Sequence, residues 1–259
     1  MIQVFTDMLG NSITLNHPPR RIISLVPSQT ELLYDLGLNE EVVGITKFCV
    51  HPDEWFRSKK KVGGTKTVHI DVIKSLSPDL IIANKEENTK EQIEELSAKF
   101  SVWVSNIQTV EDGLRMIHEV GILVGKTETA QQLTSEIRSG FAQLKKVNMP
   151  MRVAYFIWRK PWMCAGGDTF ISDIIKKIGW DNVLAEEPRY PEISLEQLIG
   201  RKPDIVLLSS EPYPFKDTHI AEIKATLPNA SVLLVDGEMF SWYGSRMKKA
   251  VPYFEKLIN

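Results

Sequence analysis

The chain has 259 residues, of which 43% are hydrophobic and 25% are charged, and its formal net charge at pH 7 is −2. These values are typical of globular proteins, and the small charge gives no electrostatic basis for binding nucleic acid or an anionic membrane. A membrane-spanning helix needs about 20 apolar residues, whereas the longest apolar runs here have the length of buried strands.

The amino terminus lacks a basic segment followed by an apolar one, so the sequence predicts no signal peptide. Two interpretations stay open: a cytoplasmic protein, or a protein whose export signal or lipid anchor has been removed. The two cysteines, Cys49 and Cys164, are too few for a disulfide scaffold and do not decide the compartment.

The first predicted elements are a small hairpin and then alternating strands and helices. Short strands at residues 3–5 and 13–15 flank a turn that contains Gly10. A buried strand at 21–26 ends at Pro27, and the sequence Ser-Gln-Thr-Glu at 28–31 predicts a capping box at the start of a helix. The remaining elements predicted in this half are strand 42–45, helix 70–76, strand 80–83, helix 89–100, strand 102–104 and helix 110–124.

One long amphipathic helix is predicted near the middle of the chain, at residues 128–147. Its apolar residues recur at steps of three and four and form one stripe: Ala130, Leu133, Ile137, Phe141 and Leu144. The alternation then resumes with strand 153–158, helices 170–178 and 195–199, strand 205–208, helix 218–225, strand 232–235 and helix 245–257.

The predicted fold class is therefore α/β, with two Rossmann-like lobes whose mostly parallel sheets are joined by one long α-helix. We expect an amino-terminal lobe at residues 1–125, a connecting helix region at 126–149 and a carboxyl-terminal lobe at 150–259. An internal repeat supports two similar lobes. Residues 70–82 match residues 195–207 as helix, Pro-Asp pair and strand, and Arg21 and Arg152 precede the first strands of the two lobes.

The loops at the carboxyl ends of the strands are the candidate binding loops, because ligands of open parallel sheets bind there. After strand 42–45, Phe48 offers an aromatic contact, and His51 offers an axial or polar partner. Cys49 is either a site residue or a buried small hydrophobe. A single Cys and His pair has too few ligands for a metal site, so we expect no resident metal and no cofactor.

The corresponding loops of the second lobe combine flat aromatic rings with guanidinium groups, which suits a large ring-bearing or anionic ligand. An alternative is that some of these rings pack on the surface between the lobes. The candidates are Trp158, Arg159, Trp162, Arg189, Tyr190, Trp242, Tyr243 and Arg246. The chain contains no nucleophile elbow, phosphate-binding loop or zinc-protease motif, so we expect binding without catalysis.

Several segments resemble the class III periplasmic binding proteins, the helical-backbone receptors for cobalamin, iron-siderophores and haem. The resemblance extends over nearly the whole chain and is carried by residues 21–31, 43–46, 62–65, 76–81 and 193–198. It implies a ligand cleft between two rigid lobes, a periplasmic or membrane-associated extracytoplasmic location, and delivery of a small-molecule metal chelate to the permease of an ABC importer. We further expect a monomer that does not bind nucleic acid.

The resemblance favours the cobalamin-binding branch. Phe48 matches an aromatic position of that branch's cleft, and Trp103 and Trp242 correspond to others, whereas Asn84 and Thr65 stand where the branch often has tryptophan. A corrinoid is therefore the first expectation for the cargo, ahead of a ferric siderophore or haem. Haem binding would need a Tyr or His ligand, and the candidates are His51, Tyr190 and Tyr243.

The resemblance also implies one acidic docking patch on each lobe that meets arginines of the permease. The internal repeat favours Glu86 and Glu211, which follow the two Pro-Asp pairs at the same spacing, whereas the resemblance favours Glu91 and Glu222 on the next helices. Two other functions stay open on the same fold: a cytoplasmic enzyme or chaperone of metal-cofactor metabolism, and an intracellular cofactor sensor.

Overall fold

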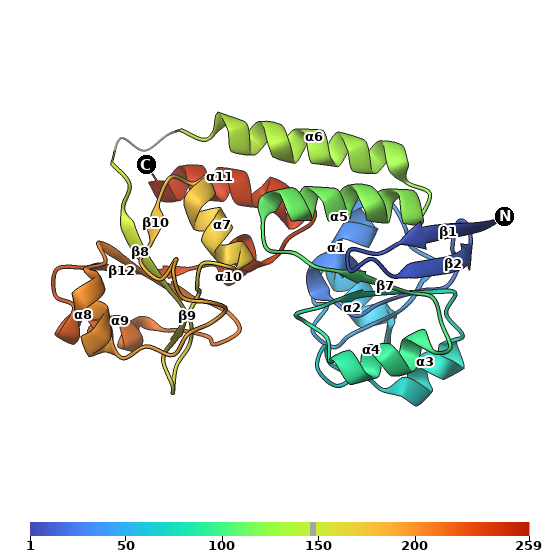
Figure 1. Ribbon diagram of the computed structural model, residues 1–259, viewed down its shortest axis with the longest axis horizontal. Helices are drawn as coiled ribbons and strands as arrows, with labels where there is room; N and C mark the ends of the chain where they lie inside the picture. Colours follow the sequence, from blue (N-terminus) through green and yellow to red (C-terminus); the bar gives the residue numbers. More distant parts are fainter. Residues whose placement is uncertain (146–148, 259) are drawn as a thin grey trace. The chain divides into compact units, whose positions relative to one another are not determined.

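The computed structural model describes residues 1–145 and 149–258, and the chain divides into two compact units (Figure 1). Unit 1 contains Met1–Ile107, Glu111–Arg138 and Tyr243–Arg246, and unit 2 contains the other residues. Helix α6 (Thr127–Gln143) contributes residues to both units.

Unit 1 is built on a five-stranded parallel sheet of order β5-β4-β3-β6-β7. Its strands are β3 (Ile22–Ser24), β4 (Val42–Ile45), β5 (Lys60–Lys61), β6 (Leu80–Asn84) and β7 (Val102–Ser105). The helices are α1 (Pro27–Asp35), α2 (Asp53–Ser58), α3 (Ile70–Leu76), α4 (Lys90–Ser97) and α5 (Val110–Leu123). A separate antiparallel hairpin consists of β1 (Ile2–Thr6) and β2 (Ser12–Asn16).

Alternate strand residues of unit 1 face opposite sides of the sheet, as the period of two in a strand requires. On one side, Ile23, Ile81 and Val102 form a buried cluster with Ile73 of α3 and Leu96 of α4. In Figure 1, α1 and α5 lie on the other side of this sheet. Both faces are therefore covered, which explains why strand β6 is buried along its whole length.

Unit 2 contains a second sheet of order β10-β8-β11-β12, all parallel, with β9 paired antiparallel to β8. Its strands are β8 (Arg152–Trp158), β9 (Met163–Cys164), β10 (Asp181–Asn182), β11 (Ile205–Ser209) and β12 (Ser231–Val235). The helices are α7 (Phe170–Lys177), α8 (Leu195–Arg201), α9 (Asp217–Thr226), α10 (Gly237–Ser241) and α11 (Arg246–Ile258).

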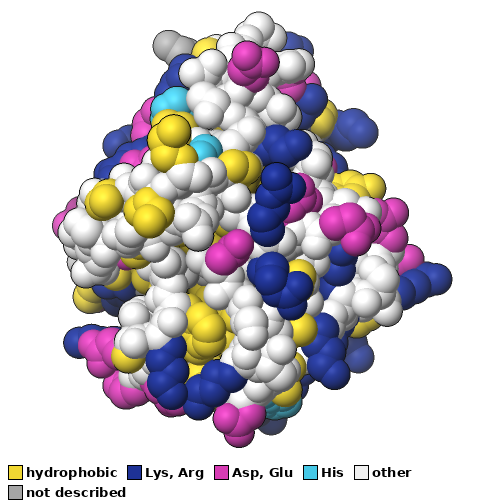
Figure 2. Space-filling model, turned by 90° about the vertical axis from the view of Figure 1, so that its right-hand side faces the viewer, with side chains coloured by type: hydrophobic (Ala, Val, Ile, Leu, Met, Phe, Trp, Pro, Cys, Tyr) yellow, Lys and Arg dark blue, Asp and Glu magenta, His cyan; other side chains and the backbone are white. Residues whose placement is uncertain are grey.

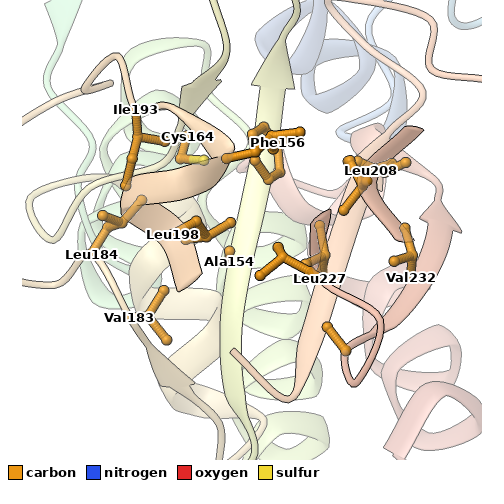
Figure 3. Close-up of a cluster of buried hydrophobic side chains, with 14 of the residues drawn as sticks. Ala154, Phe156, Cys164, Val183, Leu184, Ile193, Leu198, Leu208, Leu227 and Val232 are labelled. Atoms are coloured by element: carbon orange, nitrogen blue, oxygen red, sulfur yellow. The ribbon is translucent and has the colours of Figure 1, made fainter. Parts of the chain in front are cut away.

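The core of unit 2 has one hydrophobic layer on each side of its sheet. Figure 3 shows the layer in which Phe156 of β8 and Leu208 of β11 lie near Leu198 of α8. On the opposite side, the ring of Tyr155 lies 5.0 Å from that of Phe240. A fully buried apolar side chain of this size stabilises the fold by roughly 1.5–3 kcal/mol, so the alternation along β8 is worth several kcal/mol.

The two copies of the internal repeat form the same set of hydrogen bonds, one set in each unit. The Asp79 carboxylate accepts from the backbone N–H of Arg21 at 2.9 Å, and that of Asp204 accepts from the N–H of Arg152 at 2.8 Å. The Arg21 guanidinium donates to the Leu76 carbonyl at the end of α3, and the Arg152 guanidinium donates to the Arg201 carbonyl at the end of α8. Each unit therefore joins a helix end to the start of its first strand in the same way.

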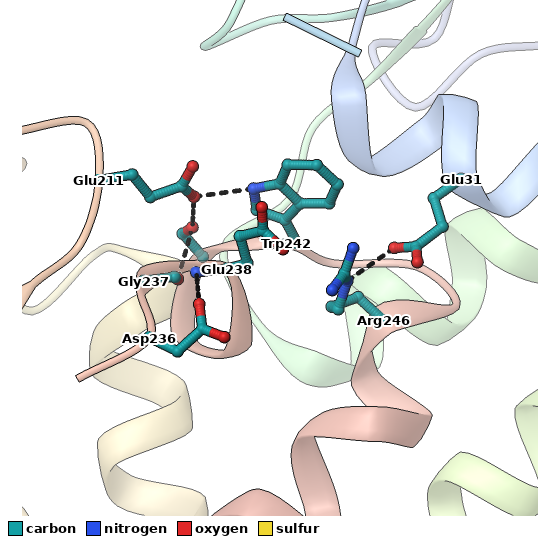
Figure 4. Close-up of polar contacts among 8 residues, drawn as sticks. Glu31, Glu211, Asp236, Gly237, Glu238, Trp242 and Arg246 are labelled. Carbon is teal, nitrogen blue, oxygen red and sulfur yellow. Dashed lines mark hydrogen bonds and ion pairs between the residues drawn. The ribbon is translucent and has the colours of Figure 1, made fainter. Parts of the chain in front are cut away.

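The predicted capping box at residues 28–31 is wrong. Helix α1 has Val26 as its N-cap and no side-chain cap, and Pro27 occupies the first turn, where its missing N–H costs no hydrogen bond. The Glu31 carboxylate instead accepts from Nε of Arg246 at 2.8 Å (Figure 4). Both side chains of this ion pair are buried, and it joins α1 to the first residue of α11 within unit 1.

The other predicted strands and helices are present, with ends shifted by a few residues. The short elements α2, α10, β5, β9 and β10 were not predicted, because segments of two to six residues depend on tertiary contacts more than on their own sequence pattern. Helix α6 ends at Gln143, and residues 146–147 of the predicted helix lie outside the described residues. Within the described part of the chain, no helix has both the length and the apolar character needed to cross a membrane.

Removing the Asp79 carboxylate tests the repeated contact. We expect Asp79→Ala to lower the free energy of unfolding by about 1–3 kcal/mol, because two backbone N–H groups, of Arg20 and Arg21, lose a charged acceptor. Asp79→Asn keeps one acceptor oxygen and should cost less. Urea denaturation measures both, with exposed Asp71→Asn on α3 as the control. Equal stabilities of all three variants would contradict the importance of the contact.

Candidate functional site

The loop after β4 places an exposed aromatic ring at the carboxyl end of the unit 1 sheet. Phe48 is 50% exposed, and the Lys47 ammonium lies 5.1 Å from the centroid of its ring. A Cβ atom at Gly64 would lie 3.1 Å from the Phe48 ring. Glycine at this position therefore leaves room for the ring, and the predicted candidate Phe48 presents a free aromatic surface.

Cys49, the neighbour of Phe48, has a structural role. Its thiol is buried and lies 3.0 Å from the Thr30 hydroxyl and 3.1 Å from the Thr46 hydroxyl. Burial raises the pKa of the Cys49 thiol, while the hydrogen bonds from Thr30 and Thr46 lower it by less. Of the two roles that the sequence left open for Cys49, the structure favours the buried small side chain that anchors the loop.

Asn84 shapes the turn after β6 from inside the protein. Its side-chain amide donates to the Ser105 hydroxyl at 2.9 Å, and its oxygen accepts from the backbone N–H groups of Glu86 and Glu87. Asn88 continues this network by donating to the Thr65 carbonyl at 3.0 Å. Asn84 is thus a buried residue at the end of β6 that fixes the following turn.

Unit 2 carries a cluster of aromatic rings at the carboxyl ends of β8 and β11. Trp158 is 40% exposed and meets Tyr213 edge to face, with 5.7 Å between ring centroids. Tyr213 in turn contacts Phe215 at 4.8 Å, and the ring of Trp162 lies nearly parallel to that of Phe215. The buried Phe215 anchors this cluster, and the indole of Trp158 forms its exposed side.

Arg159 is held in place by a carboxylate. Its guanidinium donates to both carboxylate oxygens of Glu222, at 3.0 and 2.9 Å, and its Cζ lies 5.4 Å from the Trp162 ring. A paired arginine of this kind is a weak site for a second anion, because its charge is already compensated. The same contact engages Glu222, one of the predicted docking residues.

Glu211 and Trp242 bind each other. The Trp242 indole N–H and the Ser241 hydroxyl each donate to one Glu211 oxygen at 2.8 Å (Figure 4). Burial raises the pKa of the Glu211 carboxyl, the nearby charges of Glu238 and Asp236 raise it further, and the two hydrogen bonds partly oppose this. The Glu211 carboxylate therefore supports the loop that carries Trp242 and is poorly placed as a free docking charge.

The remaining predicted site residues fall into two groups. Arg189 is exposed and lies 5.9 Å from the half-buried Tyr190 ring in the loop after β10, and His51 is half-buried in the loop after β4. The other group has side chains that are buried in the structure, and their contact with a ligand stays a prediction. Its members are Cys49, Trp103, Trp242, Tyr243 and Arg246.

Trp103 and Arg246 show why these side chains are buried. Trp103 is central to β7, and its indole N–H donates to the Thr6 carbonyl of the hairpin at 3.4 Å. Arg246 is committed to the ion pair with Glu31. By contrast, sequence reasoning missed Tyr213, Phe215 and Lys47, although all three follow the carboxyl end of a predicted strand. The rule that selected Phe48 would also have found them.

The chain belongs to the periplasmic binding protein family. The family model described as Periplasmic binding protein matches residues 22–231. The Vitamin B12-binding protein of Vibrio campbellii is 29% identical over 218 residues, which cover 82% of this chain and 78% of that protein. The predicted two-lobed α/β fold class is confirmed.

Two solved structures have the same fold. The periplasmic vitamin B12-binding protein BtuF of Vibrio cholerae is 24% identical, with 93% of this chain and 98% of that chain covered and a TM-score of 0.73. The apo periplasmic haem-binding protein RhuT from Roseiflexus sp. RS-1 is 19% identical, with 92% and 97% covered and a TM-score of 0.79.

Because the pKa of the Glu211 carboxyl is raised, its ionisation should lower the free energy of unfolding. A carboxyl whose native pKa lies above its ordinary value of 4.5 destabilises the folded state as pH rises through the native pKa. Glu211→Gln keeps an acceptor for Trp242 and Ser241 without the charge. We expect this variant to gain stability over the wild type as the pH rises above 4.5, the ordinary pKa at which the unfolded carboxyl ionises.

Urea unfolding at several pH values measures this difference, and exposed Glu186→Gln serves as the control. A stability difference between wild type and Glu211→Gln that stays constant with pH would show that the Glu211 carboxyl is not perturbed by its surroundings.

Proposed function

We propose that the protein is the substrate-binding component of an ABC importer and binds a metal chelate. A cobalamin-like corrinoid is the first choice of cargo, and a ferric siderophore or haem comes next. One observation supports this most strongly: each unit displays an exposed aromatic ring at the carboxyl end of its parallel sheet, Phe48 in unit 1 and Trp158 in unit 2.

Exposed aromatic rings favour a large, flat or macrocyclic ligand over a small polar one. Such rings remove apolar ligand surface from water and contribute dispersion contacts over a wide area. Because the Glu222 carboxylate already compensates the charge of Arg159, this part of unit 2 offers little electrostatic attraction for a strongly anionic cargo. A corrinoid fits this description, since it is large and has apolar faces. Its position between the two lobes stays a prediction.

The relative matched in sequence supports a corrinoid as the first choice, whereas the solved structures of similar fold include a vitamin B12-binding and a haem-binding protein. The curated relative described above is a vitamin B12-binding protein at 29% identity, and one protein of similar fold binds haem according to its name. Both are described by what they bind, which supports a binding role for this chain.

Truncating the two exposed rings tests the proposed site. We expect Phe48→Ala and Trp158→Ala each to weaken cyanocobalamin binding about tenfold, or ~1.4 kcal/mol, because each removes a contact surface. Titration calorimetry measures the affinity. Phe56→Ala is a matched control, because Phe56 is also exposed and also has a lysine, Lys61, 4.9 Å from its ring centroid.

The same calorimetric titration also distinguishes the cargoes. If haem or a ferric siderophore binds and cyanocobalamin does not, the corrinoid is replaced as cargo while the binding function stands. If none of the three binds, or if both ring variants keep full affinity, the proposed function and its site are contradicted.

Docking on the permease is tested best at Glu91. Of the four glutamates predicted to dock, Glu211 and Glu222 have engaged carboxylates, whereas Glu91 is exposed in the first turn of α4. We expect Glu91→Lys to leave cargo affinity unchanged and to reduce uptake into vesicles that contain the importer at least severalfold. Exposed Glu128→Lys on α6 is the control, and unchanged uptake by Glu91→Lys would exclude docking through α4.

A further inference from the structure

A groove of about 950 Å³ lies in unit 1 along β7, the edge strand of its sheet. The β1–β2 hairpin forms one wall of the groove and α4 forms the other. Hydrogen bonds join the hairpin to the β7 segment: the Met8 N–H donates to the Val104 carbonyl at 3.1 Å, the Ser101 hydroxyl donates to the Thr14 carbonyl at 2.6 Å, and the Trp103 indole N–H donates to the Thr6 carbonyl. The groove is therefore bounded by residues of one unit only.

The floor of the groove is apolar. It includes Val102 and Val104 of β7, Ile13 of the hairpin, Ile93 of α4 and Phe100, which follows α4. The three strand residues are buried, while Ile93 and Phe100 are half-buried. An apolar ligand chain that lies on this floor would leave water and gain contacts on two sides.

The rim of the groove is basic. Three lysines line it, Lys85, Lys90 and Lys99, and Glu94 is within ion-pair distance of Lys90 at 3.7 Å. The only other acidic lining residue, Asp7, has its carboxylate occupied by the backbone N–H groups of the hairpin turn.

Lys85 and Lys99 are exposed, and neither ammonium has a carboxylate within 4.0 Å among the residues that the structure describes. The groove consequently has an excess of positive charge beside an apolar floor. Figure 2 shows one face of the protein on which hydrophobic side chains lie recessed between charged side chains.

We propose that this groove binds an amphipathic anion, with an apolar chain on the floor and a carboxylate or phosphate head paired with a lysine of the rim, Lys85 at one end of β7 or Lys99 at the other. The volume is within the range of about 300–1,000 Å³ that is usual for small-molecule sites. Lysine suits such a head because its ammonium pairs with either anion without a fixed geometry. The groove does not include Phe48 or Trp158, the two exposed rings of the cargo site proposed above.

The test uses the full chain and two probes below their micelle concentrations, dodecanoate and monododecyl phosphate. Methyl-labelled protein is titrated in the NMR spectrometer. We expect the methyl signals of Ile13, Ile93, Val102 and Val104 to shift in a saturable way. Dodecyltrimethylammonium, which has the same chain and a positive head, should bind at least tenfold more weakly.

A pair of lysine substitutions tests the rim. Lys85→Gln with Lys99→Gln should weaken dodecanoate binding about tenfold and leave cyanocobalamin binding unchanged. The matched control is Lys177→Gln with Lys224→Gln, two exposed lysines of unit 2 outside the groove. The tighter of the two anionic probes identifies the preferred head group.

Three results would overturn the proposal. They are methyl shifts confined to other parts of the protein, equal affinity for the cationic and anionic amphiphiles, and full affinity in the Lys85 and Lys99 variant. Cyanocobalamin binding is measured on the same samples. A failure of the groove is thus distinguishable from a failure of the proposed importer function.

Discussion

The contact on which both sheets depend is the repeated pairing of an aspartate with the backbone that leads into the first strand. Asp79 and Asp204 each follow a helix and a proline, and each accepts from the N–H of an arginine, Arg21 or Arg152. The same arginine returns its guanidinium to the end of that helix. The amino ends of the strands are thereby fixed, and every parallel strand then delivers its loop to the opposite edge of the sheet.

The two units differ at that opposite edge, in the aromatic residues that its loops carry. In unit 1 the loop after β4 offers one ring, Phe48, beside Gly64 and above a buried network of hydroxyl and amide groups. In unit 2 several rings support one another, and only Trp158 at the outside of the cluster is markedly exposed. Similar scaffolds thus carry different exposed aromatic surfaces.

The fold was largely predictable from the sequence, because the alternation of strands and helices and the repeated Pro-Asp segment are local patterns. The exposure of single aromatic residues was not. The side chain of a tryptophan in or near a strand can face either side of the sheet. The sequence around Trp103 does not show that the hairpin contacts its indole ring. The prediction of a capping box that includes Glu31 was wrong for a related reason. Glu31 fits the local capping pattern, but its carboxylate accepts a hydrogen bond from Arg246, which lies far along the chain.

The two cysteines show one further consequence of the packing. Cys49 and Cys164 are both fully buried, and burial raises the pKa of both thiols, so the folded chain offers no thiolate at its surface. A thiolate at the surface can coordinate or reduce a metal complex, and the burial of both thiols removes this reactivity from the folded chain.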